Sequence, residues 1–183
     1  MTSREDATDQ IARRVVTGLG DDGRSRIVED APTRPWTRCP NGSLVMDLWR
    51  VDELPTPTAA SSTAGEDVVL APPEHGVVVR TSVFPPDSAV TPEQRAAYEA
   101  AMGDLYGDQG DSSKESAVPG THMTDTIDVV TVVDGEIWVV LEDGETCLRQ
   151  GDTIVQRGTR HVWQNRSERP VTVVTTMLPA TRG

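Results

Sequence analysis

Two histidines and one aspartate lie in two short segments and together could carry out acid–base or metal chemistry. The first segment, residues 122–128, contains His122 and Asp128, and the second, residues 151–165, contains His161. Successive side chains of a β-strand point to opposite faces, so residues an even number of positions apart share a face. Two imidazoles and a carboxylate that face one interior are the donor set of a 2-His-1-carboxylate metal site, and the same groups could form a metal-free acid–base pair.

Side chains beside these three residues are positioned to bind a substrate. Thr124 and Thr126 alternate along the first segment, and Trp163 follows His161 with strand spacing in the second. A threonine hydroxyl donates and accepts hydrogen bonds, and an indole ring stacks on an aromatic substrate. The alternative for the threonines is structural, because threonine favours strands and can hydrogen-bond the carboxylate of Asp128.

Two further polar residues, Gln156 and Arg157, precede a turn at Gly158. Arginine presents a planar fork of donors that binds a carbonyl or a carboxylate, so we expect Gln156 or Arg157 at the rim of the site, in contact with the substrate. The alternative for Arg157 is a surface arginine that balances nearby acids. Asn165, which ends the second segment, is expected to fix the local turn.

The two segments resemble the two signature motifs of the cupin superfamily, a group of small β-barrels. The matching positions are His122, Asp128 and Gly135 in the first motif and Gly151, Gly158, His161 and Asn165 in the second. The departures from the family pattern are Thr124 for a second histidine, Asp128 for glutamate and Arg157 for proline. The resemblance covers residues 120–178 and, more weakly, residues 68–88. It is strongest to single-domain cupins whose first motif reads His-x-Thr-x-Thr-x-Asp.

The resemblance implies an all-β fold, a cupin-type jelly-roll β-barrel, with the site in its interior. It also implies that His122, Asp128 and His161 hold a divalent metal (Fe, Mn, Ni or Zn), with no organic cofactor. The alternative is a metal-free site. It is open because the hydroxyl of Thr124 is a poor ligand and because aspartate is one methylene shorter than glutamate.

Three hypotheses for function use this site. The first is an enzyme in which His122, Asp128 and His161 are catalytic: a lyase or isomerase for dehydration, decarboxylation or cyclisation of a carbonyl-containing, polyketide-like intermediate. The choice of substrate follows from the resemblance, because the single-domain cupins with this first motif are often associated with natural-product pathways. The second is an Fe(II)-dependent dioxygenase that uses the same three residues. The third is a non-catalytic barrel that binds a small ligand.

Composition excludes several classes of partner. The chain has 183 residues, enough for one domain, and a formal net charge of −12, which would repel nucleic-acid phosphates. Cys39 and Cys147 are too few for a disulfide framework. The N-terminus lacks the apolar core of a signal peptide, and no run is long enough to span a membrane. We therefore expect a cytoplasmic protein that binds a small-molecule substrate and neither nucleic acid nor membrane.

Strand patterns dominate the chain and must position the two segments. They predict strands at residues 43–50, 77–84, 126–133, 136–141, 145–148, 153–156, 160–165 and 171–177. A helix is expected to begin at Pro92, with Thr91 as its N-cap. Asp134-Gly135 and Asp143-Gly144 predict hairpin turns. Strands at this spacing indicate a jelly-roll barrel with one short helix before the motif strands.

The chain is expected to form one domain. Residues 1–10 are predicted to be disordered, and residues 11–183 to form a single barrel domain whose core covers about residues 68–178. Residues 11–16 favour either a short helix or a first strand, followed by an Asp21-Asp22-Gly23 turn and a returning strand from Arg26. Cupin-like barrels commonly pair through edge strands, so the resemblance implies a homodimer for which these N-terminal strands could serve as the contact.

Overall fold

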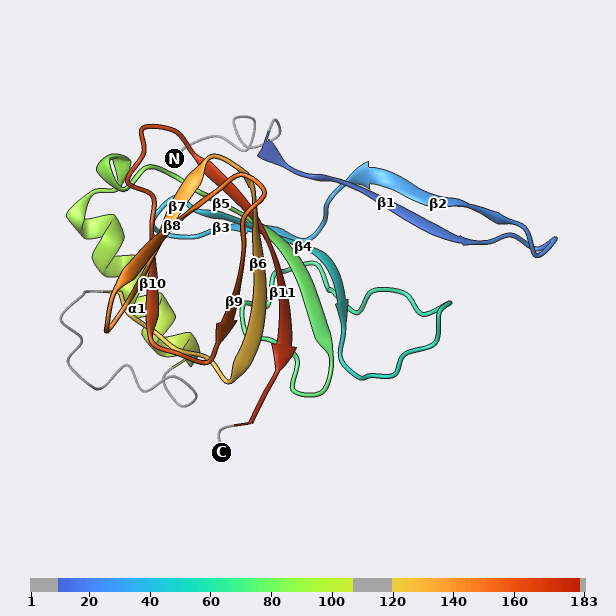
Figure 1. Ribbon diagram of the computed structural model, residues 1–183. Helices are drawn as coiled ribbons and strands as arrows, with labels where there is room; N and C mark the ends of the chain where they lie inside the picture. The colour runs from blue at the N-terminus through green and yellow to red at the C-terminus, as the bar shows by residue number, and fades with distance from the viewer. Residues whose placement is uncertain (1–9, 107–119, 182–183) are drawn as a thin grey trace.

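A larger antiparallel sheet forms one wall of the protein. The computed structural model describes residues 10–106 and 120–181. Within these residues, six strands pair in the order β3-β4-β5-β11-β6-β9, and Figure 1 shows the longest of them side by side. Their bounds are β3 (Trp36–Arg38), β4 (Leu44–Val51), β5 (Val77–Phe84), β6 (Thr126–Asp134), β9 (Thr153–Arg157) and β11 (Val171–Pro179).

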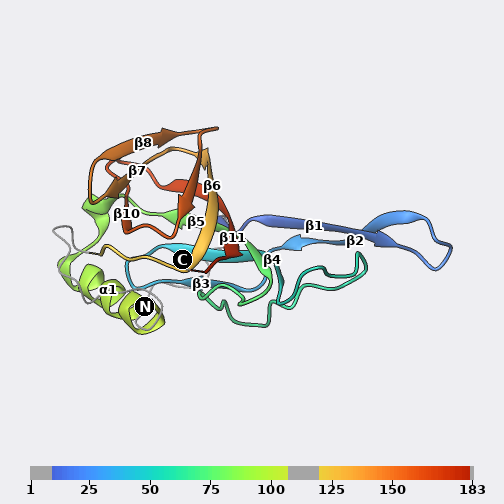
Figure 2. The same ribbon diagram turned by 60° about the horizontal axis from the view of Figure 1, so that its bottom comes forward.

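A smaller antiparallel sheet forms the opposite wall. Its strand order is β10-β7-β8, with β7 (Glu136–Leu141), β8 (Glu145–Arg149) and β10 (His161–Gln164). Figure 2 shows these strands as a layer separate from the larger sheet. The main apolar core lies between the two layers and consists of Val130, Val132, Ile137, Val139, Leu148, Val171 and Val173. Two packed antiparallel layers with one α-helix among the described residues confirm the predicted all-β jelly-roll barrel.

The chain crosses between the sheets at Asp134-Gly135, where a hairpin was expected. That prediction is wrong, because β6 ends in the larger sheet and β7 begins in the smaller one. Gly135 has φ 84°, and a Cβ added there would lie 3.2 Å from the Cα of Val171. The glycine therefore permits a tight corner rather than a hairpin. Asp143-Gly144 does close a hairpin, between β7 and β8, as predicted.

The α-helix begins where the sequence predicts. Helix α1 (Pro92–Tyr106) is preceded by Thr91, whose hydroxyl accepts a hydrogen bond from the amide of Gln94 at 3.2 Å. The side chain of Gln94 in turn accepts one from the amide of Thr91 at 2.9 Å, which completes a capping box. A single 3-10 turn, η2 (Asp87–Ala89), precedes the helix. Figure 1 shows α1 on the side of the barrel where β10 lies.

A two-stranded ribbon projects away from the barrel (Figure 1). It consists of β1 (Arg13–Leu19) and β2 (Ser25–Pro32), joined by a turn in which Gly23 has φ 74°. This outcome selects the strand alternative over the helix for residues 11–16. The predicted disorder of residues 1–10 falls on residues 1–9, which lie outside the described residues.

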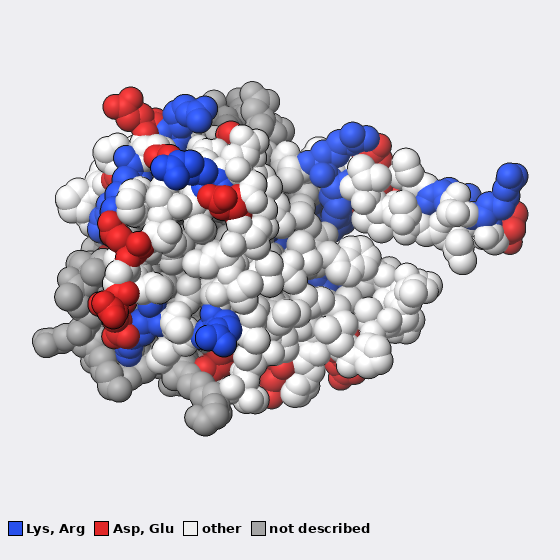
Figure 3. Space-filling view, viewed as in Figure 1, with Lys and Arg blue, Asp and Glu red and all other residues white. Residues whose placement is uncertain are grey.

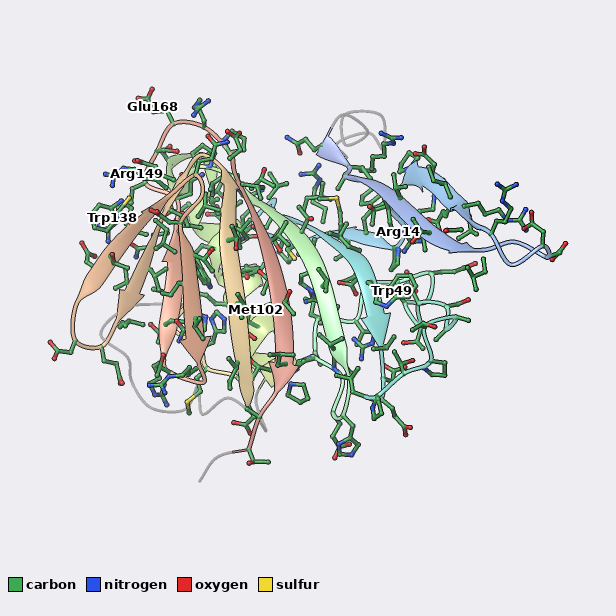
Figure 4. The ribbon with its side chains drawn as sticks, turned by 45° about the vertical axis from the view of Figure 1, so that its right-hand side comes forward. Arg14, Trp49, Met102, Trp138, Arg149 and Glu168 are labelled. Carbon is green, nitrogen blue, oxygen red and sulfur yellow. The ribbon has the colours of Figure 1, made fainter. Side chains whose placement is uncertain are left out.

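The base of the ribbon is fastened to the barrel by Arg14. Its guanidinium pairs with Glu29 at 2.6 Å and donates to the carbonyl of Leu48 at 3.2 Å. Figure 4 shows Arg14 and Trp49 near this base.

No helix among residues 10–106 and 120–181 is long and apolar enough to cross a membrane.

The ribbon exposes apolar side chains that a second copy of the chain could cover. Leu19 is 73% exposed and Ile27 is 60% exposed, and both lie on one face because Ile27 is opposite Thr17. An isolated two-stranded ribbon is marginally stable in water. Figure 3 shows, in addition, that the outer face of β6, β9 and β11 carries few charged side chains.

Size-exclusion chromatography with light-scattering detection should give a mass of about twice the 19.8 kDa of one chain. The double substitution Leu19→Asp/Ile27→Asp should convert it to a monomer, because two charges would enter the apolar contact. Arg26→Glu, on the other face of the ribbon, serves as the control and should leave the dimer intact. A wild-type mass of one chain contradicts the expectation.

Candidate active site in the barrel interior

A backbone bridge brings the two histidines together. His122 and His161 form an isolated antiparallel bridge in which each amide donates to the other's carbonyl at 3.0 Å. Their ring centroids are 4.6 Å apart. Strand β6 begins at Thr126, as expected, so His122 lies in the segment that leads into β6. The bridge thus links the approach to the larger sheet with β10 of the smaller one.

Backbone carbonyls fix the tautomer of both imidazoles. Nδ1 of His122 lies 3.2 Å from the carbonyl of Gly120, and Nδ1 of His161 lies 2.9 Å from that of Thr159. A carbonyl only accepts hydrogen bonds, so Nδ1 carries the proton in each ring and Nε2 is the acceptor.

Both imidazoles are neutral at neutral pH. Burial lowers the pKa of His122, and the carbonyl of Gly120 offsets this in part. Burial and the neighbouring His122 lower the pKa of His161 to about 3. Desolvation disfavours a charged imidazole, and two adjacent imidazolium ions would repel each other.

The carboxylate of Asp128 lies in the same interior. Its side chain, near the start of β6, is 7% exposed. Burial raises the pKa of Asp128 to about 6, whereas a hydrogen bond with Thr126 and the guanidinium of Arg80 act to lower it. The structural role considered for the threonines, a hydrogen bond to the carboxylate of Asp128, is therefore present for Thr126. The other oxygen of the carboxylate, Oδ1, has no hydrogen-bond partner among the described residues.

One cavity of about 110 Å³ collects five of the predicted site residues. They are His122, Thr124, Asp128, His161 and Trp163. The edge of the Trp163 indole faces His161, with ring centroids 5.8 Å apart. Met102 of α1 also lines the cavity, and Figure 4 shows this residue behind β6 and β11. The sequence motifs therefore converge on one interior, as predicted.

Three predicted substrate-binding residues lie outside the lining of this cavity. Thr126 is buried, and its hydroxyl is 2.6 Å from that of Thr124. Gln156 is buried but turns back to bond Thr159 within its own turn. Arg157 is exposed on β9, the edge strand. The prediction of Gln156 or Arg157 at the rim is thus corrected, and the surface alternative holds for Arg157.

Sequence reasoning missed a buried ion pair beside the cavity. Arg80 lines the cavity and lies 3.0 Å from Asp47, its partner on the neighbouring strand β4. Their side chains are only 6% and 1% exposed. The signal was a lone arginine within the otherwise uncharged strand Val77–Phe84, because a charged residue at an inward position is rarely buried without a role.

A second pocket continues from the cavity along α1. Its volume is about 60 Å³. The two pockets share the residues Ser43, Phe84, Tyr98, His122 and Trp163. His122 therefore lines both pockets, and the second pocket adds residues of α1, such as Arg95 and Glu99, and of β10, such as Val162.

The two histidines alone resemble metal ligands. Each donates Nδ1–H to a carbonyl, which is the usual support for a metal-binding imidazole. No group of three His, Cys, Asp or Glu side chains within the described parts of the chain is arranged to hold a metal ion. The implied set of His122, Asp128 and His161 does not fit a metal in this arrangement.

Asn165 fixes the loop that follows β10, as predicted. It is 2% exposed, and its side-chain amide donates to the carbonyls of Phe84 at 3.1 Å and Arg169 at 2.8 Å. Its side-chain carbonyl accepts from the amide of Ser167 at 3.1 Å. These bonds tie the loop to the end of β5, next to the pocket.

No family model matches the chain. Over 47 residues it is 55% identical to phomopsin biosynthesis cluster proteins C′ and D of Diaporthe leptostromiformis, which is 25% of this chain and 25% of each relative. Over 51 residues it is 45% identical to oryzines biosynthesis cluster protein J of Aspergillus oryzae, which is 27% of this chain and 28% of the relative. The matched segment spans about a quarter of the length of these relatives.

Cupins are among the solved structures that resemble this chain. A cupin 2 conserved barrel domain protein from Salinispora arenicola has a TM-score of 0.43 and 16% identity, covering 85% of this chain and 92% of that chain. The Cnp3 cupin domain of Schizosaccharomyces pombe has a TM-score of 0.45 and 11% identity, covering 91% and 87%. Both belong to the superfamily that the two motifs resemble. The barrel assignment itself rests on the strand order and register described above.

Replacing Asn165 with alanine should lower the free energy of unfolding by about 2 kcal/mol, because buried carbonyl groups would lose their donor. Urea denaturation measures the change. Gln164→Ala, at the end of β10, is the control and should cost less than about 0.5 kcal/mol. Equal effects of the two substitutions would show that the Asn165 bonds are not what holds the loop.

Removing divalent metal should not destabilise the protein. Dialysis against a chelator is expected to leave the melting temperature unchanged. A tightly bound metal would stabilise the folded chain by mass action, so its removal would lower the melting temperature. Elemental analysis of protein purified without chelator provides the second measurement. One metal ion per chain, lost in both His122→Ala and Asp128→Asn, would contradict this expectation.

Proposed function

We propose that this chain is a lyase or isomerase of natural-product biosynthesis that acts on a carbonyl compound inside the barrel. The observation that carries the proposal is the convergence of two neutral imidazoles, 4.6 Å apart, with the carboxylate of Asp128 in one buried cavity. Such a set can remove a proton from a carbon beside a carbonyl and return it elsewhere. Dehydration and cyclisation can begin with that proton removal, whereas a decarboxylation loses CO₂ and then needs only the return of a proton to carbon.

Asp128 is the base in this proposal. Burial makes its carboxylate more basic than one in water, with a pKa of about 6. The carboxylate takes the proton from the carbon, and the electron pair of the broken C–H bond moves onto the carbonyl oxygen. In a dehydration, the same proton then leaves with the departing hydroxyl group as water. A single carboxyl group thereby serves as base and then as acid.

The histidines position the substrate in this scheme. Because each Nδ1 donates to a backbone carbonyl, each Nε2 is oriented as an acceptor by a fixed ring. Nε2 of His122 or His161 accepts a hydrogen bond from a hydroxyl of the substrate. The low pKa of His161 keeps that ring neutral and therefore able to accept.

The relatives support the biosynthetic part of the proposal. Their names place them in the phomopsin and oryzines biosynthesis clusters, and the segments matched to this chain are 55% and 45% identical. These segments cover about a quarter of each relative. The role of this chain in the biosynthesis of a small natural product is therefore part of the proposal.

Deuterium exchange tests the proposed chemistry without knowledge of the natural substrate. Small hydroxyketones are incubated with the protein in D₂O, and NMR follows deuterium entry beside the carbonyl. The wild type should accelerate exchange, and Asp128→Asn should slow it by about 10²–10⁴-fold, the usual contribution of a general base. Asp134→Asn removes an exposed carboxylate from the same strand and should leave exchange unchanged.

Other outcomes separate the alternative functions. A ligand that binds wild type and His122→Ala equally, with no exchange above that in buffer, would indicate a non-catalytic barrel. Consumption of oxygen in step with substrate loss would indicate a dioxygenase. Either result would contradict the proposal.

A further inference from the structure

Four buried polar atoms lack hydrogen-bond partners, and they gather at one place. Among the described residues they are Ser43 Oγ, Asp47 Oδ1, Arg80 Nε and Asp128 Oδ1. Ser43, Arg80 and Asp128 line the cavity, and Asp47 is the ion-pair partner of Arg80. Buried polar atoms are nearly always paired with protein groups, water or a ligand, so this concentration is a place where a polar ligand could supply partners.

The guanidinium of Arg80 is held in place with one donor unused. Nη1 donates to the carbonyl of Leu70 and Nη2 to that of Val69, each at 3.0 Å. Nη2 also lies 3.0 Å from Oδ1 of Asp47, close enough for ionic attraction although not aligned as a hydrogen bond. Because both terminal nitrogens donate to backbone carbonyls, the orientation of the guanidinium is fixed, and its Nε–H can donate to a ligand.

The residues that carry the unused donor and the unused acceptor lie on the same face of the larger sheet and line the same cavity. Arg80 on β5 is opposite Thr175 on β11, and Asp128 on β6 is opposite Met177 on β11. One strand therefore separates the two residues, and their backbones are roughly 10 Å apart in the direction of the hydrogen bonds. Thr175 and Met177 line the same cavity between them.

We propose that Arg80 and Asp128 together bind an uncharged hydroxy-carbonyl group, and that the cavity rejects the corresponding carboxylate. The carbonyl oxygen accepts from Arg80 Nε–H, and the hydroxyl donates to Asp128 Oδ1. This names the substrate class for the proposed function and rests on it. Arg80 would also stabilise the negative charge that develops on the carbonyl oxygen when the proton leaves.

The charges around the two pockets favour a neutral ligand. Their lining contains three acids, Asp87, Glu99 and Asp128, against two bases, Arg80 and Arg95. Asp47 moreover balances Arg80 directly. An anionic ligand would meet an excess of negative charge in a buried site, where repulsion is poorly screened. Arg80 is therefore a hydrogen-bond donor here rather than an anchor for a carboxylate.

The size of the cavity restricts what enters it. Its volume of about 110 Å³ is smaller than the cavity of about 150 Å³ that holds a benzene molecule in an engineered protein. A larger substrate would therefore place only part of itself there. The remainder would extend into the adjoining pocket of about 60 Å³ along α1.

Three small probes test the proposal by NMR on the full-length protein. Hydroxyacetone carries both groups, acetone lacks the hydroxyl, and glycolate carries a carboxylate in place of the ketone. The side-chain Nε–H signal of Arg80 should shift on addition of hydroxyacetone. Hydroxyacetone should bind about tenfold more tightly than glycolate, because the like charge of glycolate is unfavourable in this site. Acetone should bind more weakly than hydroxyacetone.

The matched variant is Asp47→Asn/Arg80→Met, which removes both charges so that neither is left buried and unpaired. It should bind hydroxyacetone and acetone more weakly than the wild type does, because both lose the donor to their carbonyl oxygen, while its backbone spectrum stays that of a folded protein. If that variant does not fold, the shift of the Arg80 Nε–H signal in the wild type still decides the matter.

The outcomes separate this inference from the proposed function. Selective binding of hydroxyacetone without deuterium exchange supports the inference and removes the catalytic proposal. Exchange with no shift at Arg80 Nε–H overturns the inference and leaves the catalytic proposal standing. Equal or tighter binding of glycolate also overturns the inference.

Discussion

The candidate site depends on one backbone contact, the reciprocal pair of hydrogen bonds between His122 and His161. It joins the segment before β6 to the first residue of β10, so it fastens the two sheets together at the cavity. The same contact sets the spacing of the imidazoles, because both rings project from paired residues. Backbone geometry, rather than a side-chain contact, therefore holds the two rings in register.

Burial then determines the protonation of the groups that converge there. The same desolvation keeps His122 and His161 neutral and makes Asp128 more basic. Arg80 forms an ion pair with Asp47, and its terminal nitrogens donate to backbone carbonyls. The interior thus combines fixed acceptors, one basic carboxylate and one fixed donor, a set suited to polar chemistry on an uncharged molecule.

Local patterns predicted the elements well where the physics is local. Strand alternation located β6 to β11 within a few residues, and Thr91 with Gln94 marked the start of α1. The corner at Gly135 was misread, because the same dipeptide permits a hairpin or a crossing between sheets. Which of the two forms is decided by the sheet that the next strand joins, and that is a long-range choice.

From the sequence alone, the all-β barrel and the common interior of His122, Asp128 and His161 were expected because two segments resemble the cupin motifs. Side-chain alternation along a strand is a local property and relates only residues of the same segment. Only the tertiary structure decided that Arg157 lies outside the cavity and that Arg80 lines it. The reason is that the position of an arginine relative to a cavity depends on which strands become neighbours, and strand pairing joins residues far apart in the sequence.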